Sequence, residues 1–169
     1  CNVVADPVMS AKDGCALMDE VVLDVLKNEI IPACTLLTPN IPEAELIAQM
    51  KIDSQRDMML CAKKIYAMGC GAVLVKGGHY GGMPIDILYD GNGFYKYSSP
   101  RINTKNTHGT GCTLSSAITA FLAKGNSIQQ SVLLGKRYVY NAIKNSLEIG
   151  KGHGPLHHFY DYYSMKGFE

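Results

Sequence analysis

The stretch CTLLTPNIPEAELIAQ, residues 34–49, contains a strand that leads directly into a helix. The apolar run CTLL is typical of a buried strand, and Pro39 stops it. The residues that follow are typical of a helix, since Pro42 suits the first helical position. A strand that runs into a helix is the repeating unit of α/β proteins, so this stretch sets the fold class that we expect.

The same alternation continues on both sides of this stretch. We expect strands, the last two of them a hairpin, at residues 3–5, 34–40, 72–78, 86–89 and 94–97. We expect helices at residues 19–31, 41–49, 55–68, from 114 onward and at 127–149. Because strands and helices alternate through the first half, we predict a mainly parallel sheet covered by helices on both faces.

Composition and charge narrow the class of protein. The chain has 169 residues, 47% of them hydrophobic, which is enough for one domain with a sizeable core. Lys and Arg number 16 against 15 Asp and Glu, a balance too even to favour nucleic acid or a membrane surface as partner. Six cysteines without a C-x-x-C pair favour a cytoplasmic protein with reduced thiols. Because a strand follows Cys1 at once, we expect a chain cut from a longer protein.

The segment NTHGTGCT, residues 106–113, precedes an amphipathic helix and resembles the turn that feeds it. Gly109 and Gly111 would lie at the helix N-terminus, where unpaired N–H groups and the positive end of the dipole attract anions. Because glycine lacks a Cβ atom, a phosphate can approach this backbone closely. The alternative is a tight turn without a ligand.

Charged residues follow the predicted strands at their carboxyl ends, where ligands gather in open α/β sheets. Asp6 follows the first strand, Glu43 follows the second, and Lys76 ends the third. Two carboxylates for magnesium and a lysine, together with a phosphate-binding segment, suit phosphoryl transfer. Simpler alternatives are an Asp-Pro turn or cap for Asp6, a dipole-complementing carboxylate for Glu43, and a solvated strand end for Lys76.

Five motifs cover nearly the whole chain, in the order DPVMSAKDG, TPNIPEAE, VLVKGGH, NTHGTGCTLSSA and GKGHGPLHHF. In this order they resemble the hydroxymethylpyrimidine and hydroxymethylpyrimidine phosphate kinases of thiamine biosynthesis, members of the ribokinase-like superfamily. The superfamily commonly has aspartate where Cys112 stands, and cysteine there is typical of the pyrimidine kinases and some pyridoxine kinases. The resemblance implies a ribokinase-like three-layer α/β/α sandwich, with residues 1–169 as the carboxy-terminal part of a single kinase domain that here lacks its N-terminal part.

The resemblance also implies roles for the candidate site residues. Backbone amides of the glycine segment would bind the phosphate in transfer, at Gly109, Thr110, Gly111 and Cys112. The Cys112 side chain would face the substrate hydroxymethyl group as a base, since a helix N-terminus stabilises a thiolate. Lys76 would contact the ATP phosphates, and Val8 would line the pyrimidine pocket. Asp6 and Glu43 would organise Mg²⁺.

The implied activity is ATP-dependent phosphorylation of hydroxymethylpyrimidine, its monophosphate, or both, by a homo-oligomer. The nearest alternative is a pyridoxine or pyridoxal kinase, because both substrates are flat six-membered nitrogen heterocycles with a hydroxymethyl arm. An alternative of another class is a truncated, non-catalytic nucleotide-binding module. The resemblance implies that much of the substrate pocket lies ahead of the DPVM strand, and a chain without that part would lose many substrate contacts.

Overall fold

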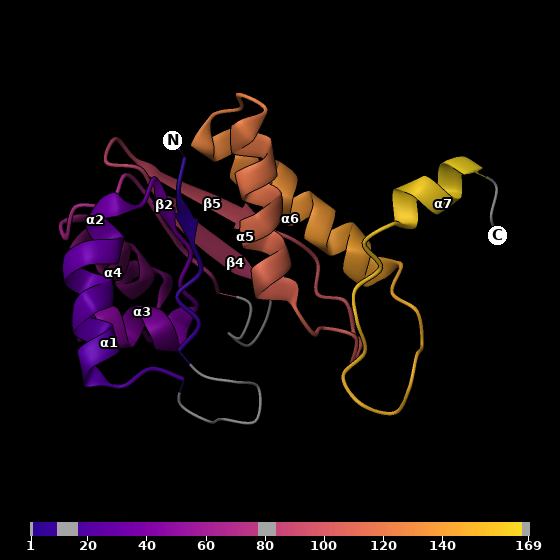
Figure 1. Cartoon of the computed structure of the whole chain (residues 1–169), viewed down its shortest axis with the longest axis horizontal. Coiled ribbons are helices and arrows are strands. Elements are labelled where there is room, and N and C mark those ends of the chain that lie inside the picture. The colour runs from indigo at the N-terminus through magenta and orange to yellow at the C-terminus, as the bar shows by residue number, and fades with distance from the viewer. Residues whose placement is uncertain (1, 10–16, 78–83, 167–169) are drawn as a thin grey trace. The chain divides into compact units, whose positions relative to one another are not determined.

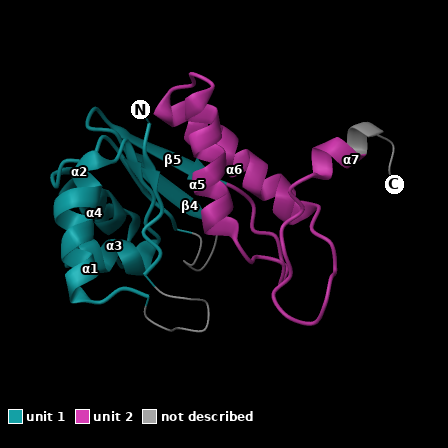
Figure 2. Cartoon of the chain, in the orientation of Figure 1, with its two compact units in different colours: residues 1–98 teal, residues 99–169 magenta. Residues whose placement is uncertain are grey.

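The computed structural model describes residues 2–9, 17–77 and 84–166 (Figure 1). The chain divides into two compact units, residues 1–98 and 99–169 (Figure 2). Parts of two motifs, DPVMSAKDG after Met9 and VLVKGGH after Gly77, lie outside the described residues.

The first unit contains one five-stranded sheet in the order β1-β2-β3-β4-β5. The strands are β1 Val4–Ala5, β2 Leu36–Leu37, β3 Val73–Val75, β4 Ile85–Tyr89 and β5 Phe94–Ser98. β1, β2 and β3 pair in parallel, whereas β4 pairs antiparallel with both β3 and β5. The predicted hairpin is confirmed as β4 and β5. Because β4 also pairs antiparallel with β3, the sheet is mixed.

The predicted helix at residues 19–31 is interrupted. It begins with α1, Glu20–Val25, whose N-cap Asp19 accepts a hydrogen bond from the backbone N–H of Val22. It continues as the π-helical turn η1, Leu26–Ile30, and ends as α2, Ile31–Ala33. Pro32 has no N–H to donate to the carbonyl four residues before it, which explains why a regular α-helical ladder does not run through this segment.

Two further helices follow in the first unit. Helix α3, Ile41–Ala48, begins one residue before Pro42, so the proline occupies the second helical position rather than the first. Helix α4, Gln55–Tyr66, has Ser54 as its N-cap, which confirms that prediction. It ends two residues before the predicted end at Met68, and Gly69 follows in the turn with a φ of 111°. All these helices pack on one face of the sheet around a core that includes Ile31, Ile47, Ile65, Val73 and Ile87 (Figure 1).

The second unit contains α5 Thr110–Ala123, α6 Ile128–Lys144 and α7 Tyr160–Lys166. α5 and α6 pack closely, and a Cβ atom at Gly135 would lie 2.9 Å from Cγ1 of Ile118. The predicted start of α5 at Leu114 is wrong, because the helix begins four residues earlier. The predicted end of α6 at Ile149 is also wrong, because the chain leaves the helix after Lys144.

A second helical layer on the sheet stays a prediction. Within the described parts of the chain, no helix is long and apolar enough to cross a membrane.

Candidate active site

Asp6 and Lys76 form an ion pair at the carboxyl ends of β1 and β3. Nζ of Lys76 lies 2.6 Å from Oδ1 of Asp6, and the side chains are only 14% and 11% exposed. Thr38, which follows β2, donates a hydrogen bond from Oγ1 to the same Asp6 oxygen at 3.1 Å. Lys76 is therefore not a solvated strand end. The parallel strands bring these side chains together because their carboxyl ends share one edge of the sheet.

Glu43 belongs to the same cluster and also caps α3. Oε2 of Glu43 accepts a hydrogen bond from the backbone N–H of Asn40 at 2.7 Å, and Oδ1 of Asn40 accepts one from the backbone N–H of Glu43 at 2.9 Å. This reciprocal pair is a capping box. Glu43 is an acidic residue in the first turn of α3, as the simpler alternative predicts, and the capping box is a structural role that was not predicted.

The electrostatic environment of Glu43 links it to the ion pair. Burial raises the pKa of the Glu43 carboxyl above its usual range, and the nearby Asp6 carboxylate adds to the rise. Hydrogen bonds with the Asn40 and Met9 backbone and the positive charge of Lys76 act in the opposite direction. The charges of Asp6 and Lys76 therefore both act on the Glu43 carboxyl, which links Glu43 to the ion pair.

The carboxylates of Asp6 and Glu43 suit a magnesium ion that takes most of its ligands from water and phosphate. Carboxylate oxygens are ligands that Mg²⁺ prefers, and it usually takes only one or two of them, with water and phosphate completing its coordination. Among the described residues, no three His, Cys, Asp or Glu side chains gather closely enough to hold a metal ion. Asp6 and Glu43 fit a magnesium ion that arrives with nucleotide phosphates better than one held by the protein alone.

Val8 lies two residues beyond Asp6, in a tight turn. Its backbone N–H donates to the carbonyl of Asp6 at 2.9 Å, and its side chain is 38% exposed. This turn places an accessible apolar side chain close to the charged cluster, although its predicted contact with a pyrimidine stays a prediction.

The glycine segment forms the start of α5 in the second unit. Gly109 is the N-cap, with a φ of 79° that favours glycine over any residue with a Cβ atom. Thr110, Gly111 and Cys112 occupy the first three helical positions, where backbone N–H groups have no acceptor within the helix. The carbonyl of Gly109 accepts from the N–H and the hydroxyl of Thr113, which fixes the helix start.

Cys112 differs from the other described cysteines because its side chain is exposed. Cys34, Cys61 and Cys70 are buried, which confirms the prediction that they act as small hydrophobic residues. Burial raises the pKa of the Cys61 thiol and of the Cys70 thiol to about 12. These buried thiols are inert at neutral pH, so Cys112 is the thiol in this group that can act on a ligand.

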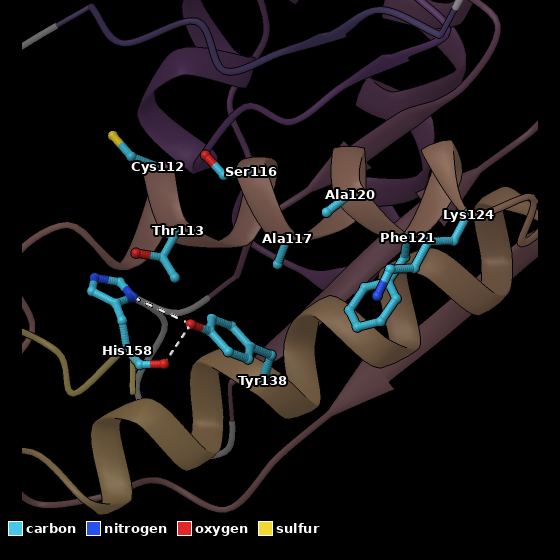
Figure 3. A pocket seen from close by; sticks show the side chains of 9 residues that line it. All are labelled: Cys112, Thr113, Ser116, Ala117, Ala120, Phe121, Lys124, Tyr138 and His158. Carbon is cyan, nitrogen blue, oxygen red and sulfur yellow. Dashed lines mark hydrogen bonds between the residues drawn. The ribbon is translucent and has the colours of Figure 1, made fainter. Parts of the chain in front are cut away.

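A groove of about 500 Å³ runs along α5 from Cys112 to Lys124. In Figure 3, Thr113 and Phe121 line the same groove as Tyr138 of α6 and His158. The hydroxyl of Tyr138 donates to the backbone carbonyl of His158 at 3.0 Å. The groove therefore begins at the residue predicted as the base.

Sequence reasoning missed Thr38 and Tyr138. Thr38 follows the same rule as the other candidates, because it is a polar residue that ends an apolar strand. His158 belongs to the motif GKGHGPLHHF, but its side chain can be placed next to Tyr138 only when the packing of the loop on α6 is known.

The mixed sheet and the helices that accompany it place the chain in the ribokinase-like α/β fold class. Residues 1–157 match the family model described as phosphomethylpyrimidine kinase, and the chain belongs to that family. The hydroxymethylpyrimidine/phosphomethylpyrimidine kinase of Bacillus subtilis is 44% identical over 160 residues, which are 94% of this chain and 59% of the relative. A bifunctional thiamine-biosynthesis protein of Geobacter sulfurreducens is 45% identical over 92% of this chain and 32% of its own length.

Solved structures of similar proteins include a pyridoxal kinase and a phosphomethylpyrimidine kinase. The pyridoxal kinase of Staphylococcus aureus in complex with ADP has a TM-score of 0.87 and 33% identity, covering 95% of this chain and 59% of that one. The phosphomethylpyrimidine kinase of Clostridium difficile has a TM-score of 0.72 and 42% identity, covering 84% and 57%. The chain thus spans less than two thirds of each of these relatives.

Proposed function

We propose that the protein containing this chain transfers the γ-phosphoryl group of ATP to the hydroxyl of hydroxymethylpyrimidine, of its monophosphate, or of both. The observation that carries the proposal is the start of α5. There the exposed side chain of Cys112 and the unpaired backbone amides of the first helical turn lie within a few residues of each other. A base and an anion cradle at one place are what phosphoryl transfer to an alcohol requires.

Each residue has a role in this proposal. The substrate hydroxyl oxygen forms a bond to the γ-phosphorus while the bond from that phosphorus to the β–γ bridging oxygen breaks and ADP leaves. The Cys112 side chain accepts the hydroxyl proton, and the amides at Thr110 and Gly111 bind the phosphate oxygens. Lys76, now paired with Asp6, contacts the nucleotide phosphates. Magnesium, when bound near Asp6 and Glu43, neutralises phosphate charge.

Pyridoxal phosphorylation is the second candidate. Its support is the similarity to the pyridoxal kinases of B. subtilis, at 35% identity and a TM-score of 0.83, and of S. aureus. Since the chain covers 59% of each of these two structures, residues outside it can decide between a pyrimidine and a pyridine ring. A nucleotide-binding module without turnover is the remaining candidate.

A parallel assay separates these candidates. ATP-dependent phosphorylation of hydroxymethylpyrimidine, its monophosphate and pyridoxal is measured in the same preparation. We expect turnover of at least one pyrimidine, and turnover of pyridoxal alone would favour the second candidate. A folded protein that binds ADP but phosphorylates none of the three compounds would leave only the nucleotide-binding module.

Gly111→Val tests the anion cradle directly. A branched side chain in the first turn of α5 would occupy space that a phosphate needs against the backbone, while valine remains compatible with a helix. We expect turnover to collapse and the circular dichroism spectrum to remain. Gly93→Val is a matched control, since the space around Gly93 is open and the residue lies in the β4–β5 turn. Normal turnover in a folded Gly111→Val protein would contradict the cradle.

A further inference from the structure

Asn106 is completely buried, three residues before the N-cap of α5. Its side-chain Nδ2 lies 3.2 Å from the carbonyl oxygen of Leu147 and 3.1 Å from Oε1 of Glu148. It also lies 3.3 Å from Oγ of Ser146. Two of these atoms can only accept, so the amide must point its N–H groups at them. Asn106 therefore ties the loop before α5 to the segment that follows α6.

The other side of the Asn106 amide is enclosed by a second segment. Oδ1 is buried without a hydrogen-bond partner, and a Cβ atom added at Gly154 would collide with it. Leaving a buried carbonyl oxygen unpartnered is unfavourable, so the contacts on the N–H side must outweigh that loss. Gly154 is required here because its Cα packs directly against the amide.

The same loop is held at a second point, two residues nearer to α5. The backbone N–H of His108 donates to the carbonyl of Gly154 at 3.2 Å, and His108 forms a bridge with Pro155. The carbonyl of Thr107, between the two tethers, accepts from Oγ1 of Thr110 in the first turn. Hydrogen bonds thus hold the backbone between Asn106 and the first turn of α5 at Asn106, Thr107 and His108.

We propose that Asn106 is a positioning residue for phosphoryl transfer, which orients the first-turn amides of α5 by clamping their leading loop to residues 146–148. The proposal rests on the proposed function, because it assigns these amides to the phosphate in transfer. Asn106 itself does not touch the phosphate. Misplacing catalytic groups by about 1 Å can cost on the order of 10² in rate, so the clamp is expected to affect kcat more than the affinity for the pyrimidine.

Asn106→Asp is the sharpest test, since it keeps the shape and removes the N–H donors. The new carboxylate would face the Leu147 carbonyl and the Glu148 carboxylate, and the repulsion should release the loop. We expect kcat to fall on the order of 10² with KM for the pyrimidine little changed. Amide hydrogen exchange should become faster at His108 and Thr113, whose backbone N–H groups donate to the carbonyls of Gly154 and Gly109. An Asn106→Asp protein with unchanged kcat and unchanged exchange would overturn the proposal.

The partner residue offers a rescue. Glu148→Gln alone keeps an acceptor oxygen and loses only an exposed ion pair with Lys105, so it should be nearly neutral. In the double variant Asn106→Asp/Glu148→Gln, the new amide can donate to the new carboxylate, and kcat should recover at least tenfold over Asn106→Asp. Absence of any recovery in kcat and in exchange would contradict a clamp that acts through Glu148.

Two further variants keep the test decisive. Asn106→Ala introduces no buried charge and should still lower kcat and speed exchange, so it replaces Asn106→Asp if that protein does not fold. Asn145→Asp makes the same chemical change at an exposed position whose Nδ2 contacts only the local carbonyl of Asn141, and it should leave both readouts unchanged. If the unsubstituted protein shows no turnover, the proposed function fails, whereas unchanged exchange in the Asn106 variants overturns the clamp itself.

Discussion

At the scale of single residues, the same side-chain type has different roles in different surroundings. Cys61 and Cys70 are neutral core residues, while Cys112 is accessible at the start of a helix. The order of motifs in the sequence singled out Cys112, and the structure adds that this residue lines one end of a groove. The difference in burial between these thiols cannot be predicted from the residues alone, because burial depends on the packing of the whole unit.

Cys112→Ala tests the proposed base. Because the transition state of phosphoryl transfer is loose, the attacking hydroxyl keeps its proton until late, and loss of a base costs less than loss of charge-neutralising groups. We expect kcat to fall by about 10²–10⁴, the usual range for general acid–base catalysis, with KM for ATP little changed. Steady-state kinetics on the preferred substrate measures this.

Two companion variants sharpen this result. Cys112→Asp should restore part of the rate, since aspartate supplies a base on a side chain of similar length. Ser116→Ala removes a small polar group one turn further along the same groove, and it should have little effect. Full kcat in Cys112→Ala with every substrate would show that Cys112 is only a small residue that fits the turn.

At the scale of elements, the sequence predicted which segments are helices and strands better than where they end. The order of strands, the β4–β5 hairpin and the Ser54 cap were all predictable from local patterns. The end of α6 was not, because residues 146–148 leave the helix to contact Asn106, 40 to 42 positions away in the chain. Long-range contacts of this kind leave no periodic signal in a sequence.

Helix α3 permits a test that separates structure from charge in the site. Glu43→Gln retains an oxygen that can accept from the Asn40 N–H, so the capping box should survive and stability should change by less than about 1 kcal/mol. The charge that we assign to magnesium is lost. We therefore expect the Mg²⁺ concentration for half-maximal rate to rise several-fold, which is measured by titrating magnesium at saturating ATP.

Helix α4 supplies the matched control. Asp57 occupies its third position, as Glu43 does in α3, and it pairs with the N-cap Ser54 at an exposed site. Asp57→Asn should leave the magnesium dependence unchanged. Equal magnesium dependence in Glu43→Gln and the unsubstituted protein would mean that Glu43 serves α3 alone.

At the scale of the whole molecule, the two compact units differ in their buried ionisable groups. Burial raises the pKa of Cys61, Cys70 and Tyr97 to about 12, and all three lie in residues 1–98. Their ordinary values are 9.0 for the thiols and 10.0 for the phenol. In the alkaline range the folded unit therefore keeps protons that the unfolded chain releases. The free energy of unfolding of this unit consequently falls as the pH rises.

High pH should consequently unfold residues 1–98 before residues 99–169. A raised folded pKa stabilises the fold fully below the unfolded value, and this contribution is lost as pH rises from about 9 toward about 12. The free energy of unfolding should fall by at most about 1.4 kcal/mol per pH unit for each proton.

Hydrogen exchange followed by mass spectrometry between pH 8 and 11, corrected for the intrinsic exchange rate, shows which unit loses its protection first. The double variant Cys61→Ala/Cys70→Ala should show a shallower slope, whereas Met58→Ala, a core truncation without an ionisable group, should lower stability at every pH alike. Simultaneous loss of protection in both units, with the same slope in all three proteins, would contradict this assignment of the alkaline limit to the first unit.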